Sequence, residues 1–410
     1  MSPAVTAPFV AIACGGTGGH LFPGLAVGEA LVRRGASVAL LISPKAVDQE
    51  AVKAAKDMES ITLPAVAFEH PHFVRFLRGF GQAFRGARRL FRQRPPDAVL
   101  AMGGFTGAPP ILAARLSHAA TFVHESNAIP GRANRWLAPW VDGAFAAFPS
   151  TARALWNRTV MVTGTPVRPQ LRSQDNAACR TSLGLDPCQP VLLVMGGSQG
   201  ARAINRLVMQ ALPLFGGQLP ELQFVHLTGP HDLDEVRAAY AAQGCRAVVR
   251  SFVAEMEIAM GAATAAISRA GASSLAELAA VRLPAILIPY PTAADNHQYV
   301  NALEFAQTNA ARMLAQRGAT ATSVTRLVAE LIRHGPARAQ IQSALKQWDR
   351  PEAAEDVASR LLAAVRGQTA TARLAWREPR EHAAAGGPTT AAGAPPRPLA
   401  AKSPWRRVAT

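Results

Sequence analysis

Two glycine-rich loops, each preceded by a short apolar run, constrain the fold of this chain most strongly. Val10–Ala13 precedes Gly15-Gly16-Thr17-Gly18-Gly19-His20, and Val191–Met195 precedes Gly196-Gly197-Ser198-Gln199-Gly200-Ala201. The apolar runs predict buried strands, and the glycines allow the backbone to turn sharply and to approach a ligand. Pro23 favours the first turn of a helix after the first loop. Each loop therefore predicts an anion site, formed by free N–H groups at the positive end of a helix dipole.

The spacing within the first loop excludes two common nucleotide-binding motifs. No Gly-Lys-Ser/Thr follows, so the loop is not the phosphate loop of nucleoside triphosphatases, and GGxGGH is not the GxGxxG of dinucleotide enzymes. The unusual residue is His20, a titratable imidazole at the mouth of the turn.

Further apolar runs end in glycines or polar residues, which is where open α/β sheets bind ligands. In the first half these runs are Ser37–Ile42, Asp97–Met102 before Gly103-Gly104, and Thr121–Val123 before His124-Glu125-Ser126-Asn127. In the second half they are Leu222–Leu227, Val248–Val253, Ala265–Ser268 and Ala285–Ile288. Their alternation with helical stretches predicts an α/β protein with two Rossmann-like domains that face one another across a cleft.

The segment Thr163–Pro169 is rich in proline and marks the crossing between the two domains. We therefore place the first domain at residues 1–165 and the second at residues 166–366, with its last helix packing back on the first domain. Residues 367–410 are rich in Ala and Pro, basic and without apolar periodicity, and we expect them to be a disordered tail.

The charge balance favours an anionic partner. A net charge of +16 fits nucleic acid, an anionic membrane surface or a phosphorylated substrate. Only three tyrosines and 6% aromatic residues leave little for base stacking, so we expect no nucleic-acid partner. The four cysteines show no CxxC spacing and are expected to be reduced thiols without zinc. No apolar run approaches the ~20 residues that a spanning helix needs, so membrane contact is expected to be peripheral.

The segment from His70 to Arg94 combines an apolar stripe with seven arginines and no carboxylate. Phe73, Leu77, Phe80 and Phe84 are spaced by four, three and four residues, and Phe91 extends the stripe. One interpretation is a helix that packs on the core with a solvated basic face. The other is an amphipathic element on an anionic bilayer, with Phe73, Phe76, Phe80 and Phe84 as its membrane residues. Gly79, Gly81 and Gly86 weaken the helix prediction, so part of the segment is also compatible with a loop.

Six motifs in this order resemble those of the MurG family, the GT-B-fold N-acetylglucosaminyltransferases of peptidoglycan synthesis. They are GGTGGH at 15–20, HESN at 124–127, GTPVR at 164–168, GGSQGA at 196–201, Arg269–Glu277 and Asp295–Ala302. The resemblance covers about the first 365 residues. The chain departs from the family pattern at HESN, where HEQN is more frequent, and at Ala270, where serine is common.

The resemblance implies transfer of N-acetylglucosamine from UDP-N-acetylglucosamine to the 4-hydroxyl of undecaprenyl-diphosphate-linked muramyl pentapeptide, with inversion. It implies no metal and no cofactor. The implied location is the cytoplasmic face of the bacterial inner membrane, as a peripheral protein on an anionic surface. Other enzymes of cell-wall synthesis are further candidate partners.

His20 is the candidate catalytic base, because a neutral imidazole suits proton removal near pH 7. Capping of the turn or binding of acceptor phosphate by His20 stays open, and Glu125 or an Asp-activated water are rival bases. By resemblance, Gly103 and Gly104 are assigned to the diphosphate of the lipid acceptor. The residues assigned to the donor by resemblance are Thr17, Gly18, Gly19, Asn127, Arg168, Ser198, Val253, Ala272, Ser273, Ser274, Leu275, Ala276, Glu277 and Gln298.

The donor residues are expected to divide the UDP-sugar among them. Ser198 and Arg168 hold the diphosphate, and Glu277 accepts hydrogen bonds from the ribose hydroxyls, as acidic residues do in dinucleotide folds. Val253 offers main-chain groups to uracil, while Asn127 and Gln298 contact the sugar.

Three other classes of function compete with the transferase. A UDP-sugar epimerase on the same fold would need no lipid acceptor and would leave the Phe/Arg segment without a task. A nucleic-acid-binding protein would explain the charge but not two glycine loops. A nicotinamide dehydrogenase lacks the required glycine spacing. UDP release measured with and without a lipid acceptor distinguishes the transferase from the epimerase.

Overall fold

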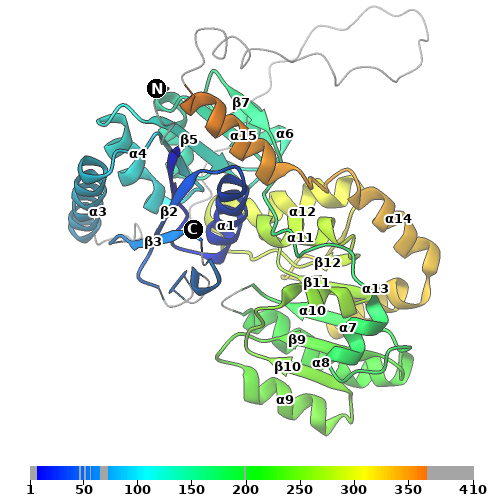
Figure 1. The fold of residues 1–410 in the computed structure, drawn as a ribbon. Helices are drawn as coiled ribbons and strands as arrows, with labels where there is room; N and C mark the ends of the chain where they lie inside the picture. The colour runs from blue at the N-terminus through cyan, green and yellow to red at the C-terminus, as the bar shows by residue number, and fades with distance from the viewer. Residues whose placement is uncertain are drawn as a thin grey trace, which may run out of the picture.

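The computed structural model describes residues 7–45, 48–49, 52–55, 57–64, 73–197 and 200–366, and it contains two parallel sheets (Figure 1). The seven-stranded sheet has the order β3-β2-β1-β4-β5-β6-β7, and the six-stranded sheet has the order β10-β9-β8-β11-β12-β13. In both sheets the order reverses at the first strand, as it does in doubly wound folds. The α/β prediction with two domains of this kind is confirmed.

The first sheet and its helices are built from residues up to Val162. Its strands are β1 (Phe9–Ala13), β2 (Ser37–Ile42), β3 (Glu59–Thr62), β4 (Ala98–Ala101), β5 (Ala120–Glu125), β6 (Gly143–Ala146) and β7 (Val160–Val162). Its helices are α1 (Gly18–Arg33), α3 (Phe73–Gln93), α4 (Ala108–Arg115), α5 (Arg132–Leu137) and α6 (Pro149–Ala154), with short 3-10 turns η1 (Val52–Ala54), η2 (Phe105–Gly107) and η3 (Ala138–Trp140).

The second sheet begins at Val191. Its strands are β8 (Val191–Met195), β9 (Gln223–Leu227), β10 (Ala247–Arg250), β11 (Ala265–Ser268), β12 (Ala285–Leu287) and β13 (Arg312–Met313). Its helices are α7 (Asn176–Ser182), α8 (Arg202–Gln218), α9 (Leu233–Ala242), α10 (Met256–Ala262), α11 (Ala272–Ala280), α12 (His297–Gln307), α13 (Ala321–Arg333) and α14 (Gly335–Leu345), with the 3-10 turn η4 (Ala294–Asn296).

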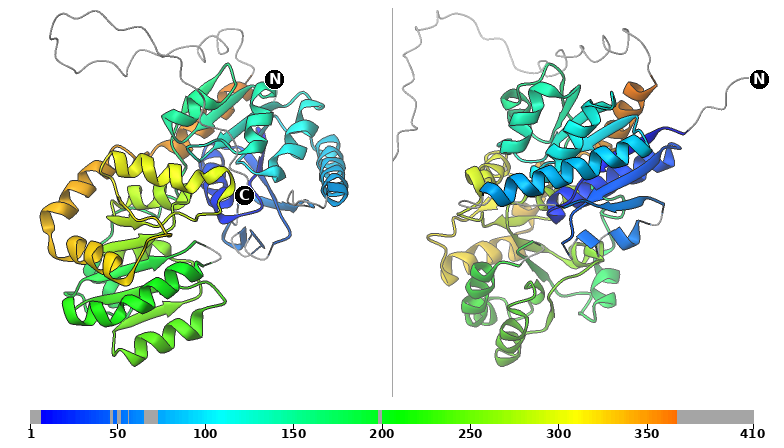
Figure 2. Two further views of the ribbon diagram at one scale, coloured as in Figure 1. Left: turned by 180° about the vertical axis from the view of Figure 1, so that it is seen from behind. Right: turned by 90° about the vertical axis from the view of Figure 1, so that its left-hand side faces the viewer.

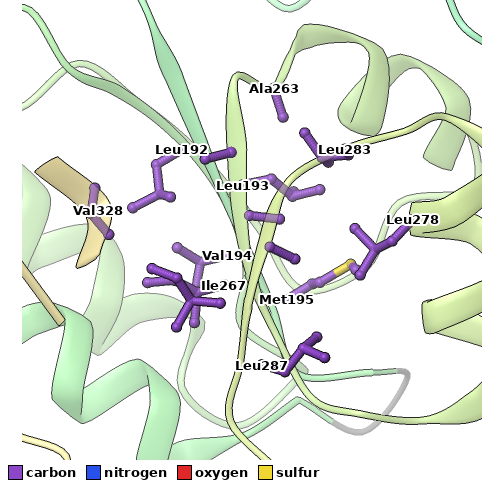
Figure 3. Close-up of a cluster of buried hydrophobic side chains, with 14 of the residues drawn as sticks. Leu192, Leu193, Val194, Met195, Ala263, Ile267, Leu278, Leu283, Leu287 and Val328 are labelled. Carbon is purple, nitrogen blue, oxygen red and sulfur yellow. The ribbon is translucent and has the colours of Figure 1, made fainter. Parts of the chain in front are cut away.

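Apolar strands explain why both sheets are buried on two faces. In the second sheet, Leu192, Leu193 and Val194 of β8 are completely buried and lie in one apolar cluster with Ile267 of the adjacent strand β11 and Leu287 of β12 (Figure 3). A strand covered on both faces needs such an unbroken apolar run instead of an alternating one.

The chain returns to the first domain in its last described helix, α15 (Ala353–Val365). Val357, Leu361 and Leu362 join the core formed by α1 and the first sheet. Arg33 and Arg34 at the end of α1 also pair with Glu355 at 2.7 and 2.8 Å. The tail 367–410 lies outside the described residues, so its predicted disorder remains a prediction.

Several local predictions need correction. Strands β3, β6, β7 and β13 were not predicted: each has only two to four residues, and β3 and β13 also contain polar or charged residues. The strand expected at Val248–Val253 ends at Arg250, so Val253 lies in the loop that follows it. Helix α1 begins at Gly18, so Pro23 lies inside the helix and not in its first turn.

Helix α3 agrees with the interpretation of the Phe/Arg segment as a helix that packs on the core with a solvated basic face, and the loop considered for part of the segment is not found within it. It is one continuous helix in spite of its three glycines, and it runs along the outside of the first domain (Figure 2, right). Phe91 is completely buried, and Phe80 and Phe84 pack partly against the core of the first domain. The apolar stripe therefore mainly faces the protein, and the large side chains that it leaves exposed are Val74 and Leu77.

Candidate active site at the domain junction

The carboxyl edges of the two sheets meet, and side chains from one domain bond to the other. Ser273 Oγ donates to the carbonyl oxygen of Gly19 at 2.9 Å, and Ala128 N donates to Asn301 Oδ1 at 2.8 Å. Arg132 and Arg135 pair with Asp295 of the second domain at 3.1 and 2.7 Å. The first glycine loop and the loop after β11 are therefore neighbours, in agreement with the predicted facing arrangement.

Pro23 explains why the carbonyl of Gly19 is available to the other domain. In a regular helix this carbonyl would accept the N–H of the residue four positions later, but proline has no N–H to donate. The carbonyl accepts from Ser273 instead. The helix thus gives up one internal bond and gains one across the junction.

The imidazole of His20 lies against the second glycine turn of the first domain. A Cβ atom on Gly103 would lie 3.0 Å from His20 Nε2, and one on Gly104 would lie 3.2 Å from its Cε1. Both glycines also have positive φ angles, 115° and 73°. A side chain at either position would therefore meet both backbone strain and the ring.

His20 is held in the uncharged form. Burial lowers the pKa of its imidazole, while the carboxylates of Glu125 and Asp48 act in the opposite direction. Nδ1 lies 3.2 Å from Thr17 Oγ1. A neutral ring with one nitrogen in contact with a hydroxyl can accept a proton on the other nitrogen.

Glu125, the rival base, is occupied by the loop that follows it. Its Oε1 accepts from the N and Nδ2 atoms of Asn127, both at 3.0 Å. Its Oε2 accepts from Gly131 N at 2.8 Å and Asn134 Nδ2 at 2.9 Å. Four donors on two oxygens fit a carboxylate that shapes the loop better than one that takes a substrate proton.

Asn127 is positioned by both domains. Besides the bond to Glu125, its Oδ1 accepts from Asn301 Nδ2 at 3.1 Å. Asn301 is completely buried, and it also donates to the carbonyl oxygen of Ala270 at 3.1 Å. The second N–H of the Asn127 side-chain amide has no acceptor among the residues that the structure describes, and it can face a ligand.

Helix α11 presents the expected donor residues. It begins after Gly271, which has no side chain to cap the first N–H groups. These N–H groups are therefore available to an anion at the positive end of the helix dipole. The register of β8 with β11 pairs Met195 with Ser268, so the loops that follow these two residues start side by side.

Glu277 and Arg168 form an electrostatic pair beside this helix. Burial raises the pKa of Glu277 to about 7, and the positive charge of Arg168 acts against that rise. The guanidinium of Arg168 lies over the ring of Phe22, 4.8 Å from its centroid, and its buried Nε has no hydrogen-bond partner among the described residues. Both side chains are therefore incompletely paired at this site.

The remaining predicted donor residues lie around the same edge. Gln298 is partly occupied, because its Oε1 accepts from Tyr290 N at 3.0 Å. Val253 lies in the loop after β10 and packs partly on the core. Ser198 lies outside the described residues. Arg269 has a structural role: it is buried, and its Nη1 donates to the carbonyl oxygens of Ile288 and Pro289.

Sequence reasoning missed two residues of the junction. Asp48 holds the first glycine loop, and Asn301, although inside a motif, had no assigned role. A signal for Asp48 existed, since Ser43 and Asp48 are polar residues that follow the strand Ser37–Ile42.

An exposed apolar cluster lies next to this site. Val74 and Leu77 at the start of α3 are 63% and 51% exposed, and Phe105 of η2 is 36% exposed. Phe76 joins them, with its ring 5.6 Å from that of Phe105 and 6.0 Å from that of Phe80. Since Phe105 directly follows Gly103-Gly104, this cluster borders the glycine turn that contacts His20. The side chain of Phe73 lies outside the described set.

The described part of the chain has no helix long and apolar enough to span a membrane. Within the same residues, no group of three or more His, Cys, Asp or Glu side chains is arranged to hold a metal ion. All four cysteines are free thiols.

Comparisons with known proteins agree with this geometry. Residues 10–146 match the glycosyltransferase family 28 N-terminal domain, and residues 191–358 match the corresponding C-terminal domain. The UDP-N-acetylglucosamine--N-acetylmuramyl-(pentapeptide) pyrophosphoryl-undecaprenol N-acetylglucosamine transferase of Anaeromyxobacter dehalogenans strain 2CP-1 is 35% identical over 368 residues, covering 87% of this chain and 92% of the relative. Its counterpart from Sorangium cellulosum is 38% identical, covering 86% and 87%.

Solved structures show the same two-domain arrangement. The crystal structure of Acinetobacter baumannii MurG superposes with a TM-score of 0.66 at 26% identity, covering 87% of this chain and 99% of that one. A UDP-N-acetylglucosamine 2-epimerase reaches a TM-score of 0.65 at 13% identity, covering 87% and 96%, which shows a shared fold only. The predicted GT-B fold is confirmed.

Proposed function

The chain belongs to the MurG family of glycosyltransferases, and from this membership we propose that it transfers N-acetylglucosamine from UDP-N-acetylglucosamine to undecaprenyl-diphosphate-linked N-acetylmuramyl pentapeptide. The acceptor atom is the 4-hydroxyl oxygen of the muramyl sugar. One observation carries the proposal at the level of the site: the neutral His20 ring lies where the first domain contacts the donor helix α11.

The reaction is a single displacement at the anomeric carbon. The acceptor oxygen forms a bond to this carbon on the face opposite the diphosphate, the carbon–oxygen bond to UDP breaks, and the configuration inverts. The acceptor proton passes to His20, and the electron pair of the broken bond leaves with UDP. The developing charge on UDP is stabilised by the α11 N-terminus and by Arg168, whose Nε has no hydrogen-bond partner within the described part of the chain.

The other predicted residues divide between donor and acceptor. Glu277 binds the ribose hydroxyls, Asn127 and Gln298 contact the sugar, and Val253 faces uracil. Ser198 and the 272–276 segment line the diphosphate. Thr17, Gly18 and Gly19 lie between the donor sugar and the lipid diphosphate, for which Gly103 and Gly104 form a second cradle. The contact of these last two glycines with His20 supports a site at this turn.

A transfer assay with a lipid acceptor and labelled UDP-N-acetylglucosamine tests the proposal. We expect label to appear in the lipid in about equal amount to the UDP released, and no UDP release without the lipid. An epimerase would instead change the configuration of the donor sugar without any lipid. That result would refute the transferase.

The same site explains why the protein would work at an anionic membrane surface, on the cytoplasmic face of the inner membrane. The cluster of Val74, Leu77, Phe76 and Phe105 borders the proposed acceptor site, where a polyprenyl chain must leave the protein. The same helix, α3, carries the exposed arginines Arg75, Arg78, Arg85, Arg88, Arg89 and Arg92. Each basic side chain near an anionic bilayer contributes roughly 1 kcal/mol. We propose no nucleic-acid partner and leave other cell-wall enzymes as candidate partners.

Replacement of Val74 and Leu77 by serine is expected to release the protein from anionic vesicles in a sedimentation assay. Both side chains are mostly exposed, so turnover on a soluble acceptor analogue and thermal stability should stay at wild-type values. Phe80 and Phe84 are unsuitable for this test because they also pack on the core. The control is Trp140→Ser with Trp156→Ser, since these tryptophans are 58% and 84% exposed near the opposite edge of the sheet. If only the control variant were released from the vesicles, the membrane contact would lie at these two tryptophans.

A further inference from the structure

Asp48 lies outside every motif described above, yet it bonds directly to the first glycine loop. We propose that Asp48 is a positioning residue for the transfer reaction: it fixes the Gly15–His20 loop and thereby the place of the His20 ring. The inference rests on the proposed function, and it assigns a task to a segment that no sequence pattern singled out.

The contacts of Asp48 converge on one carboxylate oxygen. Oδ2 accepts from Gly16 N at 2.7 Å, from Ser43 Oγ at 2.5 Å and from Ser43 N at 3.2 Å. Asp48 is completely buried. Since Ser43 directly follows β2, the carboxylate ties the glycine loop after β1 to the end of the neighbouring strand. Hydrogen bonds to a charged acceptor are about twice as strong as neutral ones.

Two further side chains fix the carbonyl groups of the same loop. Lys45 Nζ donates to the carbonyl oxygen of Gly16 at 2.8 Å, and Thr106 Oγ1 donates to that of Gly15 at 2.7 Å. The peptide groups on both sides of Gly16 are thus held by side chains, at a φ angle of 113° that favours glycine. A Cβ on Gly15 would lie 2.3 Å from Ser43 N, so this part of the loop packs directly on the end of β2.

This bracing determines which N–H groups remain for a ligand. Gly16 N is occupied by Asp48, so this N–H group is not available to an anion. The next turn begins where His20 N and Leu21 N both donate to the carbonyl oxygen of Thr17, at 3.0 and 3.1 Å. A shift of Gly16 would therefore be passed to His20, and a misplacement of about 1 Å in a catalytic group can cost roughly 100-fold in rate.

Asp48 also acts on His20 through its charge. Four groups shift the pKa of the His20 ring through their charge: Asp48 and Glu125 favour its protonated form, while Lys45 and His297 disfavour it. The buried His124 ring is also coupled electrostatically to His20, and a charge on one of these rings disfavours a charge on the other. Oδ1 of Asp48 is buried and has no hydrogen-bond partner among the described residues, so its charge is not fully neutralised by donors. Asp48 and Lys45 therefore brace the same loop but have opposite effects on the imidazole.

Three variants of the full chain test the proposal: Asp48→Ala, Asp48→Asn and Lys45→Met. For Asp48→Ala we expect kcat to fall roughly 10- to 100-fold, with the Kd for UDP within about twofold of wild type, because the nucleotide site lies in the other domain. For Asp48→Asn the acidic limb of the kcat profile should move to lower pH, and for Lys45→Met to higher pH. If Asp48 and Lys45 only held the loop in place, the two variants would not shift the acidic limb of the kcat profile in opposite directions.

Asp97→Asn is the matched control, because Asp97 Oδ2 accepts from Phe9 N at 2.8 Å at the other end of β1. It should change neither kcat nor the pH limb. Amide hydrogen exchange of the Gly15–His20 peptide should speed up in Asp48→Ala but not in the control. Hydrogen exchange can be measured without any enzyme activity. Failure of the wild type to glycosylate the lipid would therefore refute the proposed function, but it would leave the bracing of the loop by Asp48 open to this test. Unchanged exchange and kcat in Asp48→Ala, or equal pH limbs in the other two variants, would overturn the inference.

Discussion

Replacement of His20 by alanine is expected to lower kcat by roughly 10²- to 10⁴-fold, the range that positioned general bases contribute. Among the described residues the ring makes its hydrogen bond to Thr17 and lies against Gly103 and Gly104, all in its own domain. Donor affinity should therefore stay within about twofold of wild type. The measurement is single-turnover transfer to the lipid acceptor at saturating donor, together with calorimetric titration of UDP.

The pH profile of the wild type adds a second test of the same role. Burial lowers the pKa of His20 below its ordinary value of 6.5. The base is active when neutral, so activity should rise with pH through this lowered pKa, with a midpoint below pH 6.5, and then level off. His297→Ala is the informative control, because His297 also influences the His20 ring and its Nδ1 lies 2.7 Å from the carbonyl oxygen of Ala294. If His297→Ala abolished turnover and His20→Ala did not, the base would be assigned to the wrong residue.

The architecture was predictable because its signals are local. Val10–Ala13 and Val191–Met195 are unbroken apolar runs that lead into glycine loops. Strand β8 has the limits of its run, and β1 begins one residue earlier, at Phe9. The short strands β3 and β7 give weaker signals, since β3 has one apolar residue, Ile61, and β7 is an apolar run of only three residues with incomplete burial. They depend on the rest of the sheet for their formation.

The site was predictable in part, for the same reason. Motifs identify residues that follow strand ends, but they do not show which backbone groups remain unpaired in the folded protein. Pro23 was expected to start a helix, whereas its effect is to free the carbonyl of Gly19 for Ser273. The stripe of α3 has the period of an exposed amphipathic helix, yet Phe91 is buried, because the same period also serves a helix packed on a sheet.

Replacement of Glu277 by alanine is expected to weaken UDP-N-acetylglucosamine binding by roughly 10- to 100-fold, since a hydrogen bond to a charged group contributes about 1.5–3 kcal/mol. Glu277→Gln keeps one acceptor oxygen and should lose less. The matched control is Glu29→Gln: burial also raises the pKa of Glu29, and Arg168 also acts on it, but it lies on α1 of the first domain. Calorimetric titration that gave equal affinities for Glu277→Ala and wild type would remove Glu277 from the nucleotide site.

The raised pKa of Glu277 predicts opposite pH trends for binding and for stability. Ribose hydroxyls donate to the carboxylate and favour its charged form, so affinity for UDP-N-acetylglucosamine should increase up to about pH 7 and then level off. The folded protein holds the proton more tightly than the unfolded chain does, because the pKa is about 7 in the fold and 4.5 ordinarily. The stability contribution of this group is therefore complete below pH 4.5 and is lost as the pH rises through 7.

Glu277→Gln separates these two trends in one variant. An amide cannot ionise, so at pH 8 the unliganded variant should be more stable than wild type by about 1–3 kcal/mol, whereas at pH 4.5 the two should be equal. Its donor affinity should be lower than that of wild type and should no longer increase between pH 5.5 and 7. Thermal unfolding and titration at these pH values measure both effects. If the stability of Glu277→Gln had the same pH dependence as that of wild type, the carboxylate of Glu277 would not be the group that destabilises the unliganded protein at high pH.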